Sequence, residues 1–153
     1  MRKTFEQLAE DAEGTVYVDR FEDGVRLVIL RGPASLCAYL GIPLSHPLAG
    51  NSYDDLSIDC NGGFTYGAPG GKITALDAKL YWWGWDHAHC GDKCFYDLKY
   101  RLGVGRNDEK GWTVEDVEKE VWKAVYDLKR LMAVAEKAFA KGAGWRNSLA
   151  SKE

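Results

Sequence analysis

The sequence has no long apolar segment and no excess of positive charge. No stretch approaches the 18 or so consecutive apolar residues of a membrane-spanning helix, so we expect no engagement with a membrane. The first residues contain no apolar stretch typical of a secretory signal, which favours a cytoplasmic protein. Lys and Arg number 20 against 23 Asp and Glu, a net charge of −3, which argues against nucleic acid as a partner.

Cysteine is also scarce. The four cysteines, Cys37, Cys60, Cys90 and Cys94, include no C-x-x-C pair, and in a reducing compartment we expect no disulfide between them. The rest of the composition is ordinary, with 46% apolar and 28% charged residues in a chain of 153. These values are typical of a single globular domain over 1–153 and exclude a disordered or collagen-like chain.

The N-terminal part has the pattern of a short helix followed by a hairpin. Phe5 and Leu8 would share one face of a helix within the first dozen residues. Segments 15–21 and 25–30 are rich in β-branched residues, and the Glu-Asp-Gly turn between them predicts an antiparallel hairpin. The next segment, 33–40, fits either a short helix or an extended strand.

The central part of the chain alternates between loops and short strands. Two prolines and two glycines within 41–55 predict a long loop. Four aromatic residues within 80–85 predict a buried strand, with Trp83 and Trp85 on one face and Trp82 on the other. The other assignments are a strand at 56–60, β structure at 64–66, a glycine-rich connection at 67–72 and a polar loop at 86–94.

The most regular pattern is a helix at about 113–141, which would be roughly 43 Å long at about 1.5 Å per residue. Thr113 is a suitable N-cap, and acidic residues follow it in the first turn. Apolar residues recur at 114, 117, 121, 125, 128, 132, 135 and 139. The charged residues between them are interpreted as a solvated face, among them Glu118, Lys119, Glu120, Lys129 and Arg130. We expect the tail, 142–153, to be loosely ordered.

Together these elements predict an α+β fold, in which a small, mostly antiparallel sheet is covered by one long C-terminal helix. The helix face with positions 117, 121, 125, 128 and 132 is expected to pack on the aromatic strand around Trp82 to Trp85. In the alternative interpretation this apolar stripe joins two chains, so the protein is expected to be a monomer or a homodimer.

Side chains that could take part in catalysis or ligand binding cluster in two short segments, 59–66 and 85–94. These segments hold two of the three histidines and three of the four cysteines. A thiol nucleophile is one interpretation, with Cys60 activated by His89 and a nearby carboxylate. The glycines match no phosphate-binding motif. We expect no metal and no other cofactor, because the spacing is not a usual zinc spacing. The weak alternative is zinc held by Cys60, His87, His89, Cys90 and Cys94.

Three segments in order, 32–50, 59–66 and 81–92, resemble a family of small uncharacterised proteins found in bacteriophages, prophages and mobile elements. The family pattern reads [HN]-G-G-[LF]-T-[YF] followed by W-[DE]-x-A-H-x-G-D. Asn61 stands where the family usually has His, and Cys90 where it usually has Ala. The resemblance implies a host cytoplasm as the location. The site candidates that it implies are Asp59, Gly62, Gly63, Thr65, Tyr66, Trp85, Asp86, His89 and Asp92.

The function that we expect is binding. The resemblance implies a phage- or mobile-element-associated protein, with a possible anti-defence role, that engages a host or defence protein or a small molecule through its Gly/Asp/His loop face. Such loops at strand ends are normal binding surfaces. The alternative is a small hydrolase in which His89 and Asp92 or Asp86 form an acid–base pair. In both cases 59–66 and 86–92 should be adjacent, and His89 should hydrogen-bond Asp59, Asp86 or Asp92.

Overall fold

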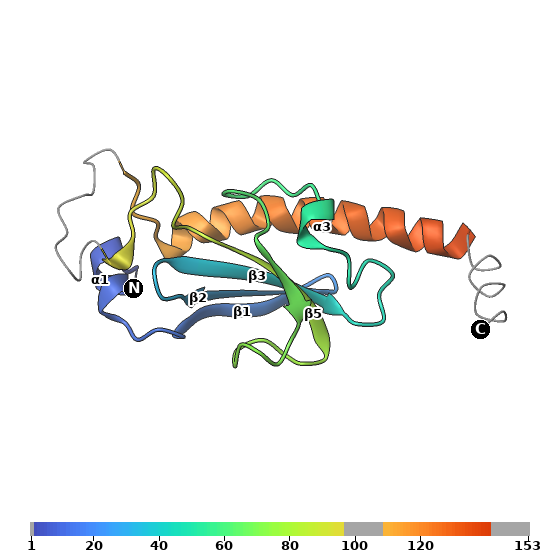
Figure 1. Cartoon of the computed structure of the whole chain (residues 1–153), viewed down its shortest axis with the longest axis horizontal. Helices are drawn as coiled ribbons and strands as arrows, with labels where there is room; N and C mark the ends of the chain where they lie inside the picture. The colour runs from blue at the N-terminus through green and yellow to red at the C-terminus, as the bar shows by residue number, and fades with distance from the viewer. Residues whose placement is uncertain (1, 97–108, 142–153) are drawn as a thin grey trace.

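A computed structural model describes residues 2–96 and 109–141 and confirms the α+β fold (Figure 1). Five antiparallel strands form one sheet in the order β1-β2-β3-β5-β4. The tail at 142–153 lies outside the described residues. In chain order the elements are α1 (Phe5–Glu10), β1 (Val16–Glu22), β2 (Val25–Arg31), β3 (Leu36–Pro43), the 3-10 turn η1 (Tyr53–Asp55), β4 (Tyr66–Pro69), β5 (Leu80–Asp86) and α3 (Val114–Lys141).

The predicted hairpin is present as β1 and β2. Asp23 and Gly24 form its turn with φ values of 49° and 84°, the left-handed conformations that tight hairpin turns need. The segment after it, for which a helix or a strand was considered, is the strand β3. It pairs with β2 on one side and β5 on the other, so three central strands are buried on both faces.

Two assignments around the central loops were wrong. Residues 56–60 form no strand, although Ile58 is buried in the core, because the Asp59 N–H donates to the Asp127 carboxylate on α3 and not to a strand. The predicted connection at 67–72 is in part β4, which pairs with β5 from Tyr66 to Pro69. The alternation of apolar residues at 56–60 therefore predicted that Ile58 is buried, but it did not predict whether the segment pairs as a strand.

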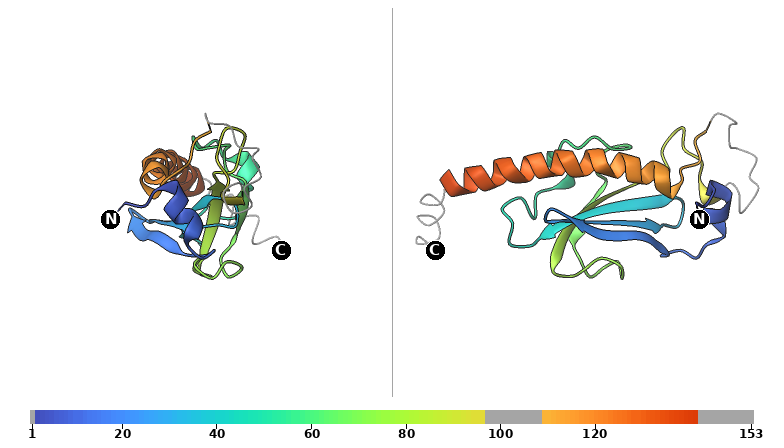
Figure 2. Two further views of the ribbon diagram at one scale, coloured as in Figure 1. Left: turned by 90° about the vertical axis from the view of Figure 1, so that its left-hand side faces the viewer. Right: turned by 180° about the vertical axis from the view of Figure 1, so that it is seen from behind.

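The long helix α3 confirms the strongest sequence pattern. The Thr113 hydroxyl accepts a hydrogen bond from the Asp116 N–H over 3.2 Å, and the Asp116 carboxylate accepts one from the Thr113 N–H over 3.1 Å, which caps the helix start. The stripe is buried at Val117, Val121, Val125, Leu128 and Met132. Figure 2 shows α3 lying along one face of the sheet, and its C-terminal turns extend past the strands (Figure 1).

The aromatic strand β5 divides its tryptophans between two cores. Trp83 and Trp85 join the core that α3 covers, as expected from the strand alternation. Trp82 lies on the opposite face with Tyr39 and Leu76, so the expectation that α3 would also cover Trp82 was wrong. No helix in the described part of the chain combines the length and apolar content that crossing a bilayer would require.

Candidate functional site

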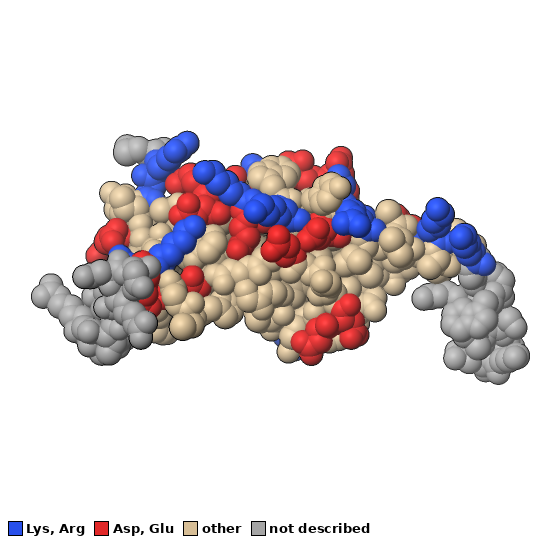
Figure 3. All heavy atoms as spheres, turned by 90° about the horizontal axis from the view of Figure 1, so that it is seen from above, with Lys and Arg blue, Asp and Glu red and all other residues tan. Residues whose placement is uncertain are grey.

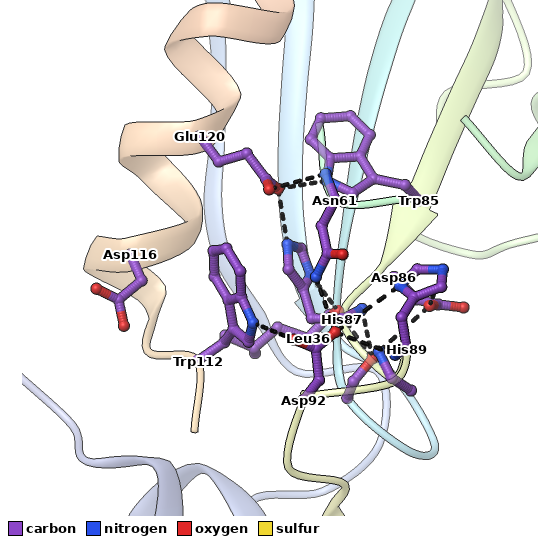
Figure 4. Close-up of polar contacts among 12 residues, drawn as sticks. Leu36, Asn61, Trp85, Asp86, His87, His89, Asp92, Trp112, Asp116 and Glu120 are labelled. Carbon is purple, nitrogen blue, oxygen red and sulfur yellow. Dashed lines mark hydrogen bonds and ion pairs between the residues drawn. The ribbon is translucent and has the colours of Figure 1, made fainter. Parts of the chain in front are cut away.

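The two polar segments lie side by side at the end of β5, next to the first turns of α3 (Figure 4). The Asn61 side chain donates from Nδ2 to Asp92 Oδ2 over 2.8 Å. A Cβ atom added to Gly62 would lie only 2.6 Å from His89 Nε2, so the imidazole rests directly on this glycine. These contacts confirm the predicted adjacency of 59–66 and 86–92.

Glu120 on α3 is the centre of the buried part of the site. Its Oε1 accepts hydrogen bonds from Trp85 Nε1 over 2.5 Å and from His87 Nε2 over 2.8 Å. Its Oε2 accepts the backbone N–H of Asn61 over 2.9 Å. One carboxylate therefore joins the helix, the end of β5 and the 59–63 loop. The interpretation of Glu120 as part of a solvated face was wrong, because the loop folds over it.

His87 is fully buried and has a partner on each ring nitrogen. Nδ1 faces the Leu36 carbonyl oxygen at 2.9 Å, and a carbonyl only accepts, so Nδ1 carries a proton. Nε2 faces Glu120. With Glu120 ionised, the geometry fits a doubly protonated imidazole held in an ion pair. The His87 ring also packs against the Trp112 ring, with a centroid separation of 4.5 Å and a tilt of 50°.

The environment of Glu120 favours its charged form. Burial alone would raise the pKa of this carboxyl. The hydrogen bonds from His87 and Trp85, the charge of His87 and the Asn61 N–H together outweigh burial, so the pKa lies below its usual value. Glu120 is therefore a fixed, ionised acceptor near neutral pH and not a proton donor.

Asp92 plays the same part at the outer end of the site. Its Oδ2 accepts from Asn61 Nδ2 and, over 3.0 Å, from the backbone N–H of His89. Its Oδ1 accepts from Trp112 Nε1 over 2.8 Å, and its side chain is largely buried. Both oxygens are thus used to hold the loop. Asp92 therefore has a structural role, whereas the sequence predicted it only as an acid–base partner.

His89 is the exposed member of the cluster. Its side chain is 33% exposed, with Nε2 3.7 Å from Asp86 Oδ1 and Nδ1 3.8 Å from Asp92 Oδ2. The predicted proximity to a carboxylate is confirmed. The predicted side-chain hydrogen bond is not formed, because both separations exceed hydrogen-bond length. Nδ1 has no hydrogen-bond partner among the described residues, since the Asp92 oxygens already receive three other donors.

The other predicted site residues are spread more widely. Trp85 is buried and reaches the site only through Glu120. Asp59 is exposed, and its backbone rather than its carboxylate is held by α3. Thr65 donates its backbone N–H to Gly84, and Tyr66 packs edge-on against Tyr39 at the opposite face of the sheet. The structure therefore gathers Gly62, Asp86, His89 and Asp92, with Gly63 beside them, and leaves Thr65 and Tyr66 apart.

The described side chains form no cluster that could hold a metal ion, and Cys60 lacks the environment of a nucleophilic thiol. Within 2–96 and 109–141, no three His, Cys, Asp or Glu side chains are placed to hold a metal ion, and both nitrogens of His87 are already engaged. All four cysteines are free. Burial, reinforced by the charge of Glu120, raises the pKa of the Cys60 thiol to about 12, whereas a nucleophilic cysteine needs a lowered pKa.

Three residues of the site were not predicted from the sequence: Glu120, Asp127 and Trp112. Each lies in the C-terminal third, outside the two polar segments. Glu120 and Asp127 share one flank of α3, seven positions apart, and both accept a backbone N–H from the 59–61 loop. That spacing on one helix flank was the available signal, but nothing in the sequence linked it to this loop.

No protein-family model, curated protein or solved structure shows a significant match to this chain. The resemblance to phage-associated proteins therefore stays a prediction.

Proposed function

We propose that this protein is a small binding protein whose ligand contacts the loop face around His89, Asp86, Gly62 and Gly91. The observation that carries the proposal is the contrast within the cluster. The inner carboxylates of Glu120 and Asp92 each accept three hydrogen bonds, whereas the His89 ring is one-third exposed and forms no hydrogen bond with the described residues. Its Nδ1 is itself buried, so the exposed edge of the ring is the part that a ligand could contact. A rigid frame that holds a partly exposed polar ring, not engaged by the frame itself, is what a binding site requires.

The frame is held by six hydrogen bonds to two carboxylates. Glu120 accepts three donors and Asp92 accepts three, and these donors come from the 59–63 loop, the end of β5, the loop after it and Trp112. Buried polar networks of this kind fix side chains in one arrangement when every member is satisfied. Little conformational entropy would then be lost when a ligand binds.

The surface that this frame presents is polar and open. His89 is one-third exposed and Asp86 is 46% exposed, so the face combines an imidazole with a carboxylate. Gly62 and Gly91 are exposed and have positive φ, so the face includes main chain that no side chain of these residues covers. This chemistry suits a polar small molecule or a polar protein surface that supplies hydrogen-bond donors. The resemblance to phage-associated proteins supports a bacterial host or defence component as the source.

A hydrolase with His89 as the acid–base residue is the second candidate. It is favoured by the two carboxylates that flank the imidazole at 3.7 and 3.8 Å, because such bonds often tighten when a substrate binds. Binding is preferred because neither carboxylate hydrogen-bonds the ring and Asp92 is fully engaged elsewhere.

Gly62 and Gly63 offer a matched pair of variants for the test. Both have left-handed φ values, 75° and 72°, so an alanine at either position carries a similar backbone strain of about 1–2 kcal/mol. Only the alanine at 62 would push into the His89 ring, because nothing lies within 4 Å of a Cβ at 63. Comparing Gly62→Ala with Gly63→Ala therefore isolates the placement of His89 from general strain.

The experiment uses immobilised full-length protein exposed to a bacterial lysate and to a mixture of small polar metabolites. Wild type and Gly63→Ala should retain the same component, while His89→Ala and Gly62→Ala should lose it, as measured by mass spectrometry of the eluates. Circular dichroism melts verify that all four proteins are folded. Equal retention by wild type and His89→Ala would contradict the proposal, and chemical conversion of a metabolite by wild type alone would favour the hydrolase.

A further inference from the structure

One flank of α3 is apolar and open although the helix packs well on the sheet. Trp122 and Tyr126 are exposed, and with Ala133 they line a groove of about 420 Å³ beside the β1–β2 turn. At 3.6 residues per turn these three positions share one side of the helix. The Glu120 and Asp127 flank, which holds the 59–61 loop, faces the other way. The apolar flank is therefore separate from the His89 face.

A basic ridge borders this stripe on its outer side. Lys119, Lys123, Arg130 and Lys137 follow one another along the solvent-facing edge of the helix, and Figure 3 shows Lys and Arg side chains along the helix. None of the four forms an ion pair with the part of the chain that the structure describes. The ridge thus carries four positive charges without a direct ion pair in the described part of the chain, on a protein whose net charge is −3.

An acidic rim borders the stripe on its inner side, toward the hairpin. Glu22 and Glu118 share Arg20, at 3.7 and 3.3 Å, and Asp23 pairs with Lys129 at 2.6 Å. Three carboxylates against two cations leave this rim with a net charge of −1. The flank therefore has an apolar centre, a positive edge and a negative edge.

We propose that this flank is the interface of a homodimer in which the two α3 helices run parallel. A two-fold axis parallel to the helices places the basic ridge of each chain opposite the acidic rim of the other, while the apolar stripes meet between them. Antiparallel helices would set one basic ridge against the other. Trp, Tyr and Arg, the residues that dominate binding energy at interfaces, all occur on this flank.

This arrangement differs from the seam considered on sequence grounds. The stripe from Val117 to Met132 is buried within one chain and is not available to a partner. The homodimer would use the neighbouring flank and leave both His89 faces free. Because the helices are parallel, the two faces would lie at the same end of the dimer.

Sedimentation velocity on the full chain tests the association. Over about 1 to 100 µM, where a micromolar Kd is measurable, wild type should convert from monomer to dimer. Replacing Trp122 and Tyr126 together with alanine should weaken the dimer at least about tenfold. Val134→Ala is the matched control, since Val134 and Tyr126 are both 66% exposed and Val134 lies off the stripe. A wild type that stays monomeric, or an equal effect of Val134→Ala, would overturn the proposal.

Cross-linking tests the direction of the helices. Under mild oxidation Ala133→Cys should form a disulfide-linked dimer, because parallel helices place the two positions opposite each other. In an antiparallel pair crossing at Tyr126 they would be 14 residues apart along the axis, roughly 21 Å, too far for a disulfide. Wild type, with its exposed Cys90, is the control for unrelated linkage. A dimer in which Ala133→Cys does not cross-link beyond this control would refute parallel pairing.

Discussion

Replacing Glu120 tests the hydrogen-bonded frame on which the binding site depends. Glu120→Ala would leave Trp85 Nε1, His87 Nε2 and the Asn61 N–H without their acceptor. Removing one partner of a buried ion pair costs about 3–5 kcal/mol, because the remaining charge stays buried and unpaired. Urea unfolding at neutral pH, with the free energy of unfolding extrapolated to water, should show a loss of this size.

Two further variants show how much of the lost stability comes from the charge of Glu120, and how that loss compares with the removal of a surface carboxylate. Glu120→Gln keeps an oxygen for two of the donors but turns an amide N–H₂ toward the third, so about 1–3 kcal/mol should be lost. Glu118→Ala, two positions away, removes only a surface pair with Arg20 at 3.3 Å, which contributes about 0–1 kcal/mol. A Glu120→Ala loss no greater than that of Glu118→Ala would refute the frame.

The pH dependence of the same melts provides an independent check. The pKa of Glu120 is lower in the folded protein than its usual value, so the unfolded chain takes up the proton first as the pH falls. The stabilisation from the ionised carboxylate is complete above the usual glutamate pKa and is lost as the pH falls through the folded value. The stability difference between wild type and Glu120→Gln should therefore shrink on acidification, and a constant difference would contradict this assignment.

Two more predictions concern the core and the thiols. Leu128→Ala should cost about 2–5 kcal/mol in denaturant melts, since Leu128 is fully buried, whereas Lys123→Ala on the exposed side should stay within about 0.5 kcal/mol. After denaturation without reductant, mass spectrometry should find all four cysteines alkylated; in the native protein Cys90 should react first, because burial raises the pKa of Cys37 to about 11 and of Cys60 to about 12. A native Cys60 that reacts as fast as Cys90 would contradict the burial argument.

Features that depend on local geometry could be predicted from the sequence alone. The Asp-Gly pair specified the hairpin turn, because positive φ is easily reached there and a two-residue turn fixes the strand register. The periodic apolar residues of α3 specified both its length and its buried face. Alternation along β5 correctly separated Trp83 and Trp85 from Trp82, since successive strand side chains point to opposite faces.

Tertiary structure alone decided which polar residues are buried. Glu120 lies on a flank of α3 whose charged residues predicted exposure to solvent. It is buried only because a loop 59 positions earlier in the chain folds over it. His87 and His89 look alike in sequence, yet β5 ends at Asp86, and beyond it one imidazole turns into the core while the other lies at the surface. No local pattern encodes these outcomes, because the desolvation and hydrogen bonding of a side chain depend on segments that meet it only in the folded chain.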